Sequence, residues 1–195
     1  KSFLKSALIG GYLGKGSKNY FPEMNGHDLD QKYVIDIDTE QGPYHAQRAF
    51  RRITEITGDR YENYIPFALR SFSAHERLQF IEWLHFESEY KDNLGLVSID
   101  GIADLVSDVN NIESCNKMVQ QLMSMTEQTN SAMITVLHSN YGSRKATGHL
   151  GSSVMKKAES IVYVERDADS NIVTVSPDYT RNIPFTPFEF TLNAE

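Results

Sequence analysis

The chain has 195 residues, the size of one ordinary domain with room for a buried core, which excludes a short peptide or a small scaffold held together by disulfides. Its 40% apolar and 23% charged residues are typical of a folded domain rather than a disordered segment. A formal net charge of −7 provides no overall basic field, so any binding of nucleic acid or anionic lipid must be local.

The single cysteine, Cys115, excludes a disulfide within the chain and any zinc site that needs two cysteines. A reducing, cytoplasmic location fits this composition best. No apolar run approaches the ~18 residues that a membrane-spanning helix needs, so we expect no membrane partner.

Helix and strand signals alternate along the first two thirds of the chain. Ser73 and Glu76 have the spacing of a capping box, and LGLVSID at 94–100 has the continuous apolar character of a strand buried on both faces. In chain order we predict a helix at 2–14, a loop at 14–31, a strand at 32–38, a helix at 44–57 closed by Gly58, a strand at 64–69, a helix opened at 73–76, a buried strand at 94–100, a helix at 112–128 and a second buried strand at 132–138.

This alternation predicts an α/β fold, mainly a parallel sheet with helices on both faces. After a loop at 139–151, the segments SIVYVER and NIVTVSP predict an antiparallel hairpin added at one edge, turning at 167–170. The proline- and phenylalanine-rich tail NIPFTPFEF is interpreted as a segment that docks on a neighbouring molecule.

Polar residues follow three of the predicted strands, at the sheet edge where α/β proteins bind their ligands. Asp100 closes the strand at 94–100, and several carboxylates with a histidine and an asparagine suit a site for a metal and a phosphate. The other candidates at this edge are Asp38, Thr39, Glu40, Gln41, His138 and Asn140.

Each candidate also has a purely structural interpretation. Asp100 at a strand end can cap a helix or form a turn, and Glu40 can sit favourably at the start of the next helix. His138 can be an ordinary core histidine. The convergence of three strand ends on one edge favours the functional interpretation over these separate ones.

LGLVSID, four apolar positions closing on an Asp, resembles the Walker B strand of P-loop ATPases. The order of elements, from KSFLKSAL through DTEQGPYHAQRAFRRI, LRSFSAHERL and LGLVSIDGIADLV to ITVLHSN and GHLGSSVMKKAESIVYVE, resembles the RecA-like ATPases. Within them it is most similar to hexameric helicase-type ATPases of the plasmid RepA and DnaB kind, as found in replication or mobilisation proteins of bacterial mobile elements. The resemblance implies a single RecA-like core over 1–195, with ATP and Mg²⁺ as cofactors.

The resemblance also assigns roles at the first residues. Lys1 and Ser2 match the end of a phosphate-binding loop, G-x-x-x-x-G-K-[ST], so Lys1 would contact the β- and γ-phosphates and the Ser2 hydroxyl would bind Mg²⁺. The glycines would precede Lys1, so the sequence would begin inside or just after this loop, and the isolated fragment would be inactive. The alternative is that Lys-Ser is a common dipeptide at an arbitrary position.

Three further roles follow from the same resemblance. Asp100 would hold Mg²⁺ through water, Glu40 would orient or deprotonate the attacking water, and His138 with Asn140 would detect the γ-phosphate.

Arg144 and Lys145 lie on a Gly- and Ser-rich loop. They are interpreted as a finger reaching a neighbouring subunit's nucleotide, as contacts to a nucleic-acid phosphate, or as a solvent-exposed loop. Relatives often carry an Arg before the Gly-Ser pair, where this chain has GHLGSS. Arg48, Arg51 and Arg52 are interpreted as a solvated or subunit-contacting helix face.

Three functions therefore remain open. The first is an ATP-hydrolysing motor domain that forms a ring, possibly a hexamer, on single-stranded DNA. The second is a nucleotide-binding regulatory or assembly module of the same fold without motor activity. The third is an α/β enzyme unrelated to nucleotides, since fold alone does not fix function.

Overall fold

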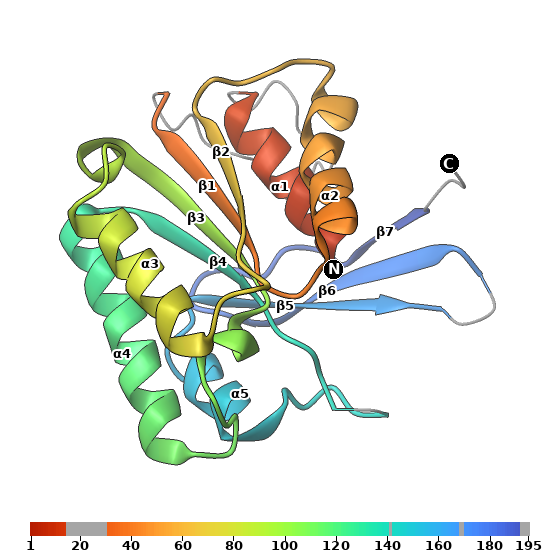
Figure 1. The fold of residues 1–195 in the computed structure, drawn as a ribbon. Helices are drawn as coiled ribbons and strands as arrows, with labels where there is room; N and C mark the ends of the chain where they lie inside the picture. The colour runs from red at the N-terminus through yellow and green to blue at the C-terminus, as the bar shows by residue number, and fades with distance from the viewer. Residues whose placement is uncertain (15–30, 141, 168–169, 192–195) are drawn as a thin grey trace.

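The computed structural model describes residues 1–14, 31–140, 142–167 and 170–191 (Figure 1). Nearly all of the predicted loop at 14–31, and the centre of the turn predicted at 167–170, lie outside these residues. Every helix and strand predicted before residue 139 is present, with bounds that differ by at most two residues.

A parallel sheet of four strands forms the centre of the fold. Its strands are β1 (Tyr33–Asp38), β2 (Tyr64–Ala68), β3 (Leu94–Asp100) and β4 (Ala132–Val136), in the order β2-β1-β3-β4. The register places Asp38 beside Asp100, and Asp100 beside Val136. The carboxyl ends of β1, β3 and β4 therefore lie level at one edge, which we call the rim.

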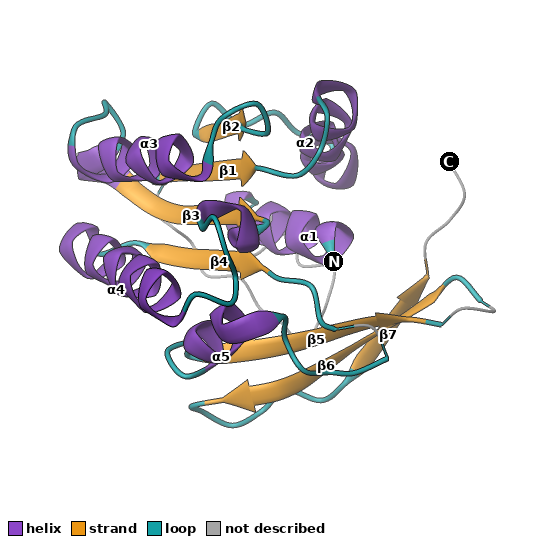
Figure 2. Cartoon of the chain, turned by 60° about the horizontal axis from the view of Figure 1, so that its bottom comes forward, coloured by secondary structure: helices purple, strands orange, loops and turns teal. Residues whose placement is uncertain are grey.

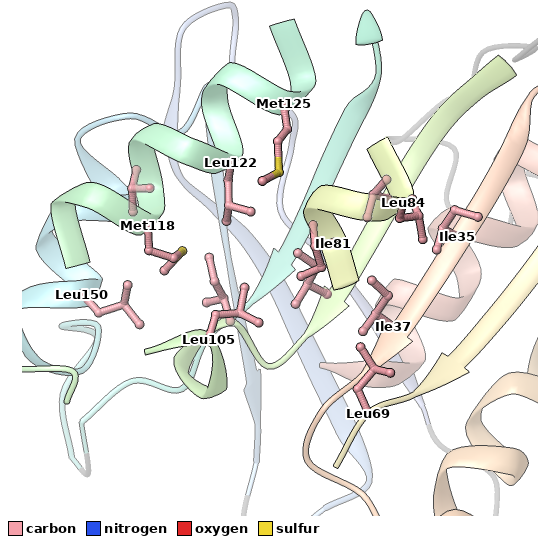
Figure 3. Close-up of a cluster of buried hydrophobic side chains, with 14 of the residues drawn as sticks. Ile35, Ile37, Leu69, Ile81, Leu84, Leu105, Met118, Leu122, Met125 and Leu150 are labelled. Atoms are coloured by element: carbon pink, nitrogen blue, oxygen red, sulfur yellow. The ribbon is translucent and has the colours of Figure 1, made fainter. Parts of the chain in front are cut away.

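Helices cover both faces of this sheet, as predicted (Figure 2). On one face lie α1 (Ser2–Leu13) and α2 (Pro43–Thr57), and on the other lie α3 (Ala74–Phe86) and α4 (Ile112–Thr129). Alternate residues of β1 supply the two cores, because successive side chains of a strand point to opposite faces. Val34 packs with α1 and α2, whereas Ile35 and Ile37 pack with α3 and α4 (Figure 3).

Local signals set the ends of two helices. Pro43 begins α2, and Gly58 ends it in the left-handed conformation at φ 73°, which glycine adopts without steric cost. The predicted capping box of α3 is present: the Ser73 hydroxyl accepts from the backbone N–H of Glu76, whose carboxylate accepts from the backbone N–H of Ser73.

The two outer strands show what an edge position allows. Pro66 lies in β2, which pairs on one side only, so the donor missing from proline leaves no gap within the sheet. A strand is present at Ala132–Val136, but the prediction that it is buried on both faces is wrong. Because β4 is also an edge strand of this sheet, its residues are exposed or half-buried rather than buried on both faces.

A helix occupies part of the segment predicted as a loop. α5 (Gly148–Met155) contains two glycines and two serines, which are poor helix formers, so its residues carry no local signal for a helix. Tertiary contacts hold it instead. Leu150 is fully buried in the core shared with α4, and the Ser153 hydroxyl donates to the Asn116 side chain at 2.8 Å.

The carboxyl-terminal strands form a second sheet. β5 (Ser160–Arg166) and β6 (Ile172–Thr180) make the predicted antiparallel hairpin, and β7 (Phe188–Thr191) pairs with β6. Within the described residues these three strands are a separate sheet and not an addition to an edge of the parallel one. The tail predicted to dock on a neighbour is thus partly used within the chain, through β7.

Two short 3-10 helices, Lys91–Asn93 and Ile102–Leu105, flank β3. The second begins just after Gly101 and carries Asp104 under the rim. Among the helices that the structure describes, none is long and apolar enough to cross a membrane.

The buried histidine of α3 gives the fold a predicted pH dependence. His85 is 1% exposed, its Nδ1 lies 2.8 Å from the Ile81 carbonyl, and its Nε2 has no hydrogen-bond partner in the described residues. Burial lowers the pKa of His85 below its ordinary value of 6.5, although the bond to Ile81 opposes part of this shift. The unfolded chain therefore binds a proton first as the pH falls through 6.5, and stability is lost.

We expect the free energy of unfolding to fall by up to about 1 kcal/mol between pH 7.5 and 5.5 through His85. His85→Leu should remove this part of the pH dependence, as measured by urea unfolding at both pH values. Identical pH profiles for the two proteins would show that His85 accepts a proton as readily in the folded state.

Candidate active site

The ends of β1 and β3 are joined by the side chain of Thr39. Its backbone N–H donates to the Asp100 carbonyl at 2.8 Å, and its hydroxyl accepts from the Gly101 N–H at 2.9 Å. The hydroxyl proton faces two acceptors at 2.9 Å, the Gly101 carbonyl and Asp104 Oδ2. These contacts hold the turn after β1 against the end of β3.

Asp38 holds that turn through hydrogen bonds to the two residues that follow Thr39. Its buried carboxylate accepts from the backbone N–H groups of Glu40 at 3.0 Å and Gln41 at 2.8 Å, and from the Gln41 side-chain amide at 2.7 Å. Burial raises the pKa of Asp38, and the two backbone donors oppose part of the shift. Asp38 and Gln41 therefore act as turn residues that present Glu40 to the rim.

Glu40 lies across Gly101, facing the end of β4. Its Oε2 is 3.4 Å from His138 Nε2. A Cβ atom on Gly101 would stand 2.9 Å from the carboxylate carbon of Glu40, and closer still to Oε1. The backbone of Gly101 has φ −122°, which any residue can adopt. Space for the Glu40 carboxylate, rather than backbone conformation, is thus what this glycine provides.

Ser2, the first residue of α1, contacts Asp100 at the end of β3. The Ser2 hydroxyl donates to Asp100 Oδ2 at 2.9 Å. Because this bond uses the hydroxyl proton, the oxygen lone pairs of Ser2 are free to bind a cation.

Lys5, one turn further along α1, is buried beneath this contact. It is 3% exposed, and its ammonium lies 2.9 Å from Asp36 Oδ1 and 3.4 Å from Asp100 Oδ2. Burial disfavours the ammonium, but the carboxylates of Asp36 and Asp100 outweigh this and raise the pKa of Lys5. Tyr64 completes the group by donating its hydroxyl proton to Asp36 Oδ2 at 2.9 Å, and burial beside that carboxylate raises the pKa of Tyr64.

Lys1 reaches the end of β4. Its ammonium donates to the Leu137 carbonyl at 2.7 Å, which places the first residue beside the rim (Figure 2). Partial burial lowers the pKa of Lys1, while Glu40 and Asp100 counteract that shift. The structure therefore brings Lys1, Ser2, Glu40, Asp100 and His138 together at the rim, and the roles assigned to them from the sequence stay predictions.

The segment after β4 forms a small hairpin. The His138 carbonyl accepts from the backbone and hydroxyl of Thr147, and the Asn140 N–H donates to the Lys145 carbonyl. Within the described residues, no bond joins the Asn140 side chain to the other candidates. Asn140 thus lies on the same segment as His138 without being tied to the rim.

The described contacts of Arg144 lie on β5, away from the rim of its own chain. The Arg144 guanidinium lies 4.6 Å from the centre of the Tyr163 ring and 3.8 Å from Glu165 Oε2, so it rests on β5. Arg144 and Lys145 are both exposed.

One predicted surface arginine behaves differently. Arg48 and Arg51 are exposed on α2, but Arg52 is half-buried, with its guanidinium 3.7 Å from the centre of the Phe3 ring. Its interpretation as a fully solvated residue is therefore wrong, because it packs on Phe3 of α1, while a subunit contact of this face stays a prediction.

Lys5, Asp36 and Gly101 belong to the site but were not predicted from the sequence. A signal for the first two was present, since Lys5 interrupts an apolar helix and Asp36 interrupts an apolar strand. Charged residues in such positions are rarely buried unless paired. Gly101 had no such signal, because the need for space beside Glu40 is visible only in the folded structure.

The rim suits a magnesium ion that arrives with phosphate groups. In the part of the chain that is described, no three His, Cys, Asp or Glu side chains form a metal cluster. Magnesium at phosphate-transfer sites needs only one or two protein oxygens, since waters and phosphates supply the rest. The Ser2 hydroxyl and the Asp100 carboxylate, already hydrogen-bonded to each other, fit that requirement.

These features define a RecA-like α/β fold. The crystal structure of the RadB recombinase superposes with a TM-score of 0.57 and 19% identity, covering 85% of this chain and 77% of that chain. No family model matches the sequence, and no curated protein matches it. The similarity therefore establishes the fold.

The hydrogen bonds of Thr39 to Gly101 and Asp104 should contribute measurably to stability. Thr39→Val keeps the shape but leaves the buried Gly101 N–H without its acceptor, so we expect the free energy of unfolding to fall by about 1–3 kcal/mol in urea titrations. Thr174→Val is the matched control, because the bond that this hydroxyl donates to Glu189 Oε1 at 3.1 Å is exposed to solvent. Equal, small effects of the two substitutions would contradict the assigned role of Thr39.

Proposed function

We propose that this chain is the core of an ATP-hydrolysing motor of the helicase type, acting in DNA replication or mobilisation. The observation that carries the proposal is the bond between Ser2 and Asp100, which joins the start of α1 to the end of β3, with Lys1 near enough to interact electrostatically with Asp100 and Glu40. A helix start, a hydroxyl, a strand-end carboxylate and a second carboxylate at one edge are the parts that phosphoryl transfer needs.

Lys1 and the amino end of α1 would bind the phosphates. The ammonium of Lys1 now donates to a backbone carbonyl, a contact it can exchange for the β- and γ-phosphate oxygens. The backbone N–H groups of the first turn of α1 add donors and a favourable dipole. The proposal includes a glycine-rich phosphate loop before Lys1 in the full-length protein.

Ser2 and Asp100 would hold Mg²⁺, Ser2 directly and Asp100 through water. When bound, Mg²⁺ neutralises the charge that develops on the phosphates. The role of Asp100 is to supply a negative charge and to accept the Ser2 proton, so that the hydroxyl oxygen faces the cation.

Glu40 would orient and deprotonate the attacking water, and His138 would sense the γ-phosphate. The carboxylate is half-exposed at the rim, held in place by the Asp38 turn and by contact with Gly101. His138 stands 3.4 Å from Glu40, so a γ-phosphate that binds His138 also changes the surroundings of the base.

Two substitutions separate these roles in the full-length protein. Glu40→Gln should lower hydrolysis by a factor of about 100 or more while ATP affinity changes little, because the loss falls on the transition state. Asp100→Asn should also lower hydrolysis by orders of magnitude. The remaining rate should depend less on the Mg²⁺ concentration. Turnover assays and nucleotide titrations measure both effects.

Glu127→Gln, an exposed carboxylate on α4, is the control and should retain full activity. Unchanged turnover in Glu40→Gln would show that Glu40 is not the base. Wild-type protein that binds nucleotide without turnover would favour the alternative function, a nucleotide-binding regulatory or assembly module. A joint loss of binding and turnover in Glu40→Gln would make Glu40 a structural or metal-binding residue.

The proposal extends to a ring, possibly a hexamer, on single-stranded DNA. Arg144 and Lys145 are exposed on the hairpin after β4, and the contacts of Arg144 lie on β5 of its own chain. Delivered to a neighbouring subunit, a basic group of this hairpin would add positive charge at the γ-phosphate. Such a head-to-tail contact is heterologous, so it closes into a ring or winds into a filament, and we propose the ring.

Mixing variants tests the delivery between subunits. Rings of Arg144→Ala/Lys145→Ala subunits and rings of Glu40→Gln subunits should each be inactive, and mixed rings should regain part of the single-stranded DNA-stimulated hydrolysis. Lys91→Ala, an exposed lysine before β3 at the opposite edge of the sheet, is the control. No recovery at any ratio, with rings confirmed by light scattering, would contradict the trans role.

A further inference from the structure

Lys5 is a buried cation shared between two carboxylates with different surroundings. Asp36 lies in the middle of β1 and is 1% exposed, and it also accepts the Tyr64 proton. Asp100 lies at the rim and accepts the Ser2 proton. A lysine that served only to neutralise Asp36 would not need its ammonium 3.4 Å from the rim carboxylate.

Both contacts to Asp100 involve the same oxygen. Oδ2 faces Ser2 at 2.9 Å and Lys5 at 3.4 Å, while Oδ1 has no bond to any residue that the structure describes. Asp100 is thus oriented by the protein before any ligand arrives, with one oxygen left for it.

The three carboxylates around Lys5 attract cations, and Lys1 and Arg52 also act electrostatically on Asp100. Asp36, Asp38 and Asp100 all influence Lys5 electrostatically, and Lys5 is the cation in contact with Asp36 and Asp100 among residues 1–14, 31–140, 142–167 and 170–191. Unit charges a few ångströms apart interact strongly away from bulk water. A fixed ammonium therefore opposes the entry of a second cation beside Asp100.

We propose that Lys5 is a positioning residue that keeps Asp100 from binding a divalent metal until nucleotide phosphates bring further ligands and negative charge. Metal uptake at the rim is in this way made dependent on nucleotide. The inference rests on the proposed function in that Asp100 is the carboxylate that holds the metal.

The test is the affinity for Mn²⁺ alone, without nucleotide, followed by the electron paramagnetic resonance signal of the free ion. The matched pair is Asp36→Asn against Lys5→Met/Asp36→Asn, which differ in Lys5 only. Asparagine at 36 still accepts the Tyr64 proton, so the double variant buries no unpaired charge at that site, whereas Lys5→Met alone risks unfolding. Thermal unfolding confirms that both proteins are folded.

We expect Mn²⁺ to bind the double variant at least about tenfold more tightly than it binds Asp36→Asn or the wild type, a change of about 1.4 kcal/mol. Adding Asp100→Asn to the double variant should abolish the gain, which locates the ion at Asp100. Equal Mn²⁺ affinities in the matched pair, or a gain that survives Asp100→Asn, would overturn the proposal.

Failure of this inference and failure of the proposed function are distinguishable. The Mn²⁺ titration contains no nucleotide and measures no turnover, whereas the proposed function fails if Asp100→Asn leaves hydrolysis unchanged in the otherwise wild-type protein. Active wild-type protein with equal Mn²⁺ affinities in the matched pair would leave the motor intact and reduce Lys5 to a structural partner of Asp36.

Discussion

The ion pair between Lys5 and Asp36 fixes α1 against the middle of the parallel sheet. Both side chains are buried, so sliding or rotating the helix would leave an unpaired charge, which costs several kcal/mol. Ser2 lies three residues before Lys5 on the same side of α1, and this spacing is what brings its hydroxyl to Asp100. The geometry of the rim on the α1 side thus follows from one contact made deeper in the fold.

The elements predicted well are those whose signal is local. The strand LGLVSID is continuous in apolar residues, and the capping box at Ser73 fixes the start of α3, so both could be located from the sequence. The convergence of Asp100, Glu40 and His138 followed from a general property of parallel sheets, whose strands end at one edge.

The elements that were missed depend on partners distant in sequence. α5 forms because Leu150 enters a core built by other helices, and β7 forms because β6 offers it an edge. The pairing of Lys5 with Asp36 joins residues 31 positions apart, so neither residue alone revealed it. Tertiary contacts of this kind override local propensity.

The antiparallel sheet determines where the basic hairpin rests. Arg144 lies on Tyr163 and beside Glu165, and both residues of the ion pair are more than half exposed. Exposed pairs of this type contribute little free energy. The arginine can therefore leave β5 at small cost, which a residue proposed to serve a neighbouring molecule requires.

Gly101 couples two positions that are far apart in the sequence. The volume beside its Cα is already occupied by the carboxylate of Glu40, so a methyl group at 101 and a glutamate in this conformation at 40 exclude each other. Related sequences that carry a larger residue at 101 should then show a shorter side chain at 40, or a turn that lifts the carboxylate away from β3. Correlated substitution at positions 40 and 101 would then record a contact that neither residue reveals when it is considered alone.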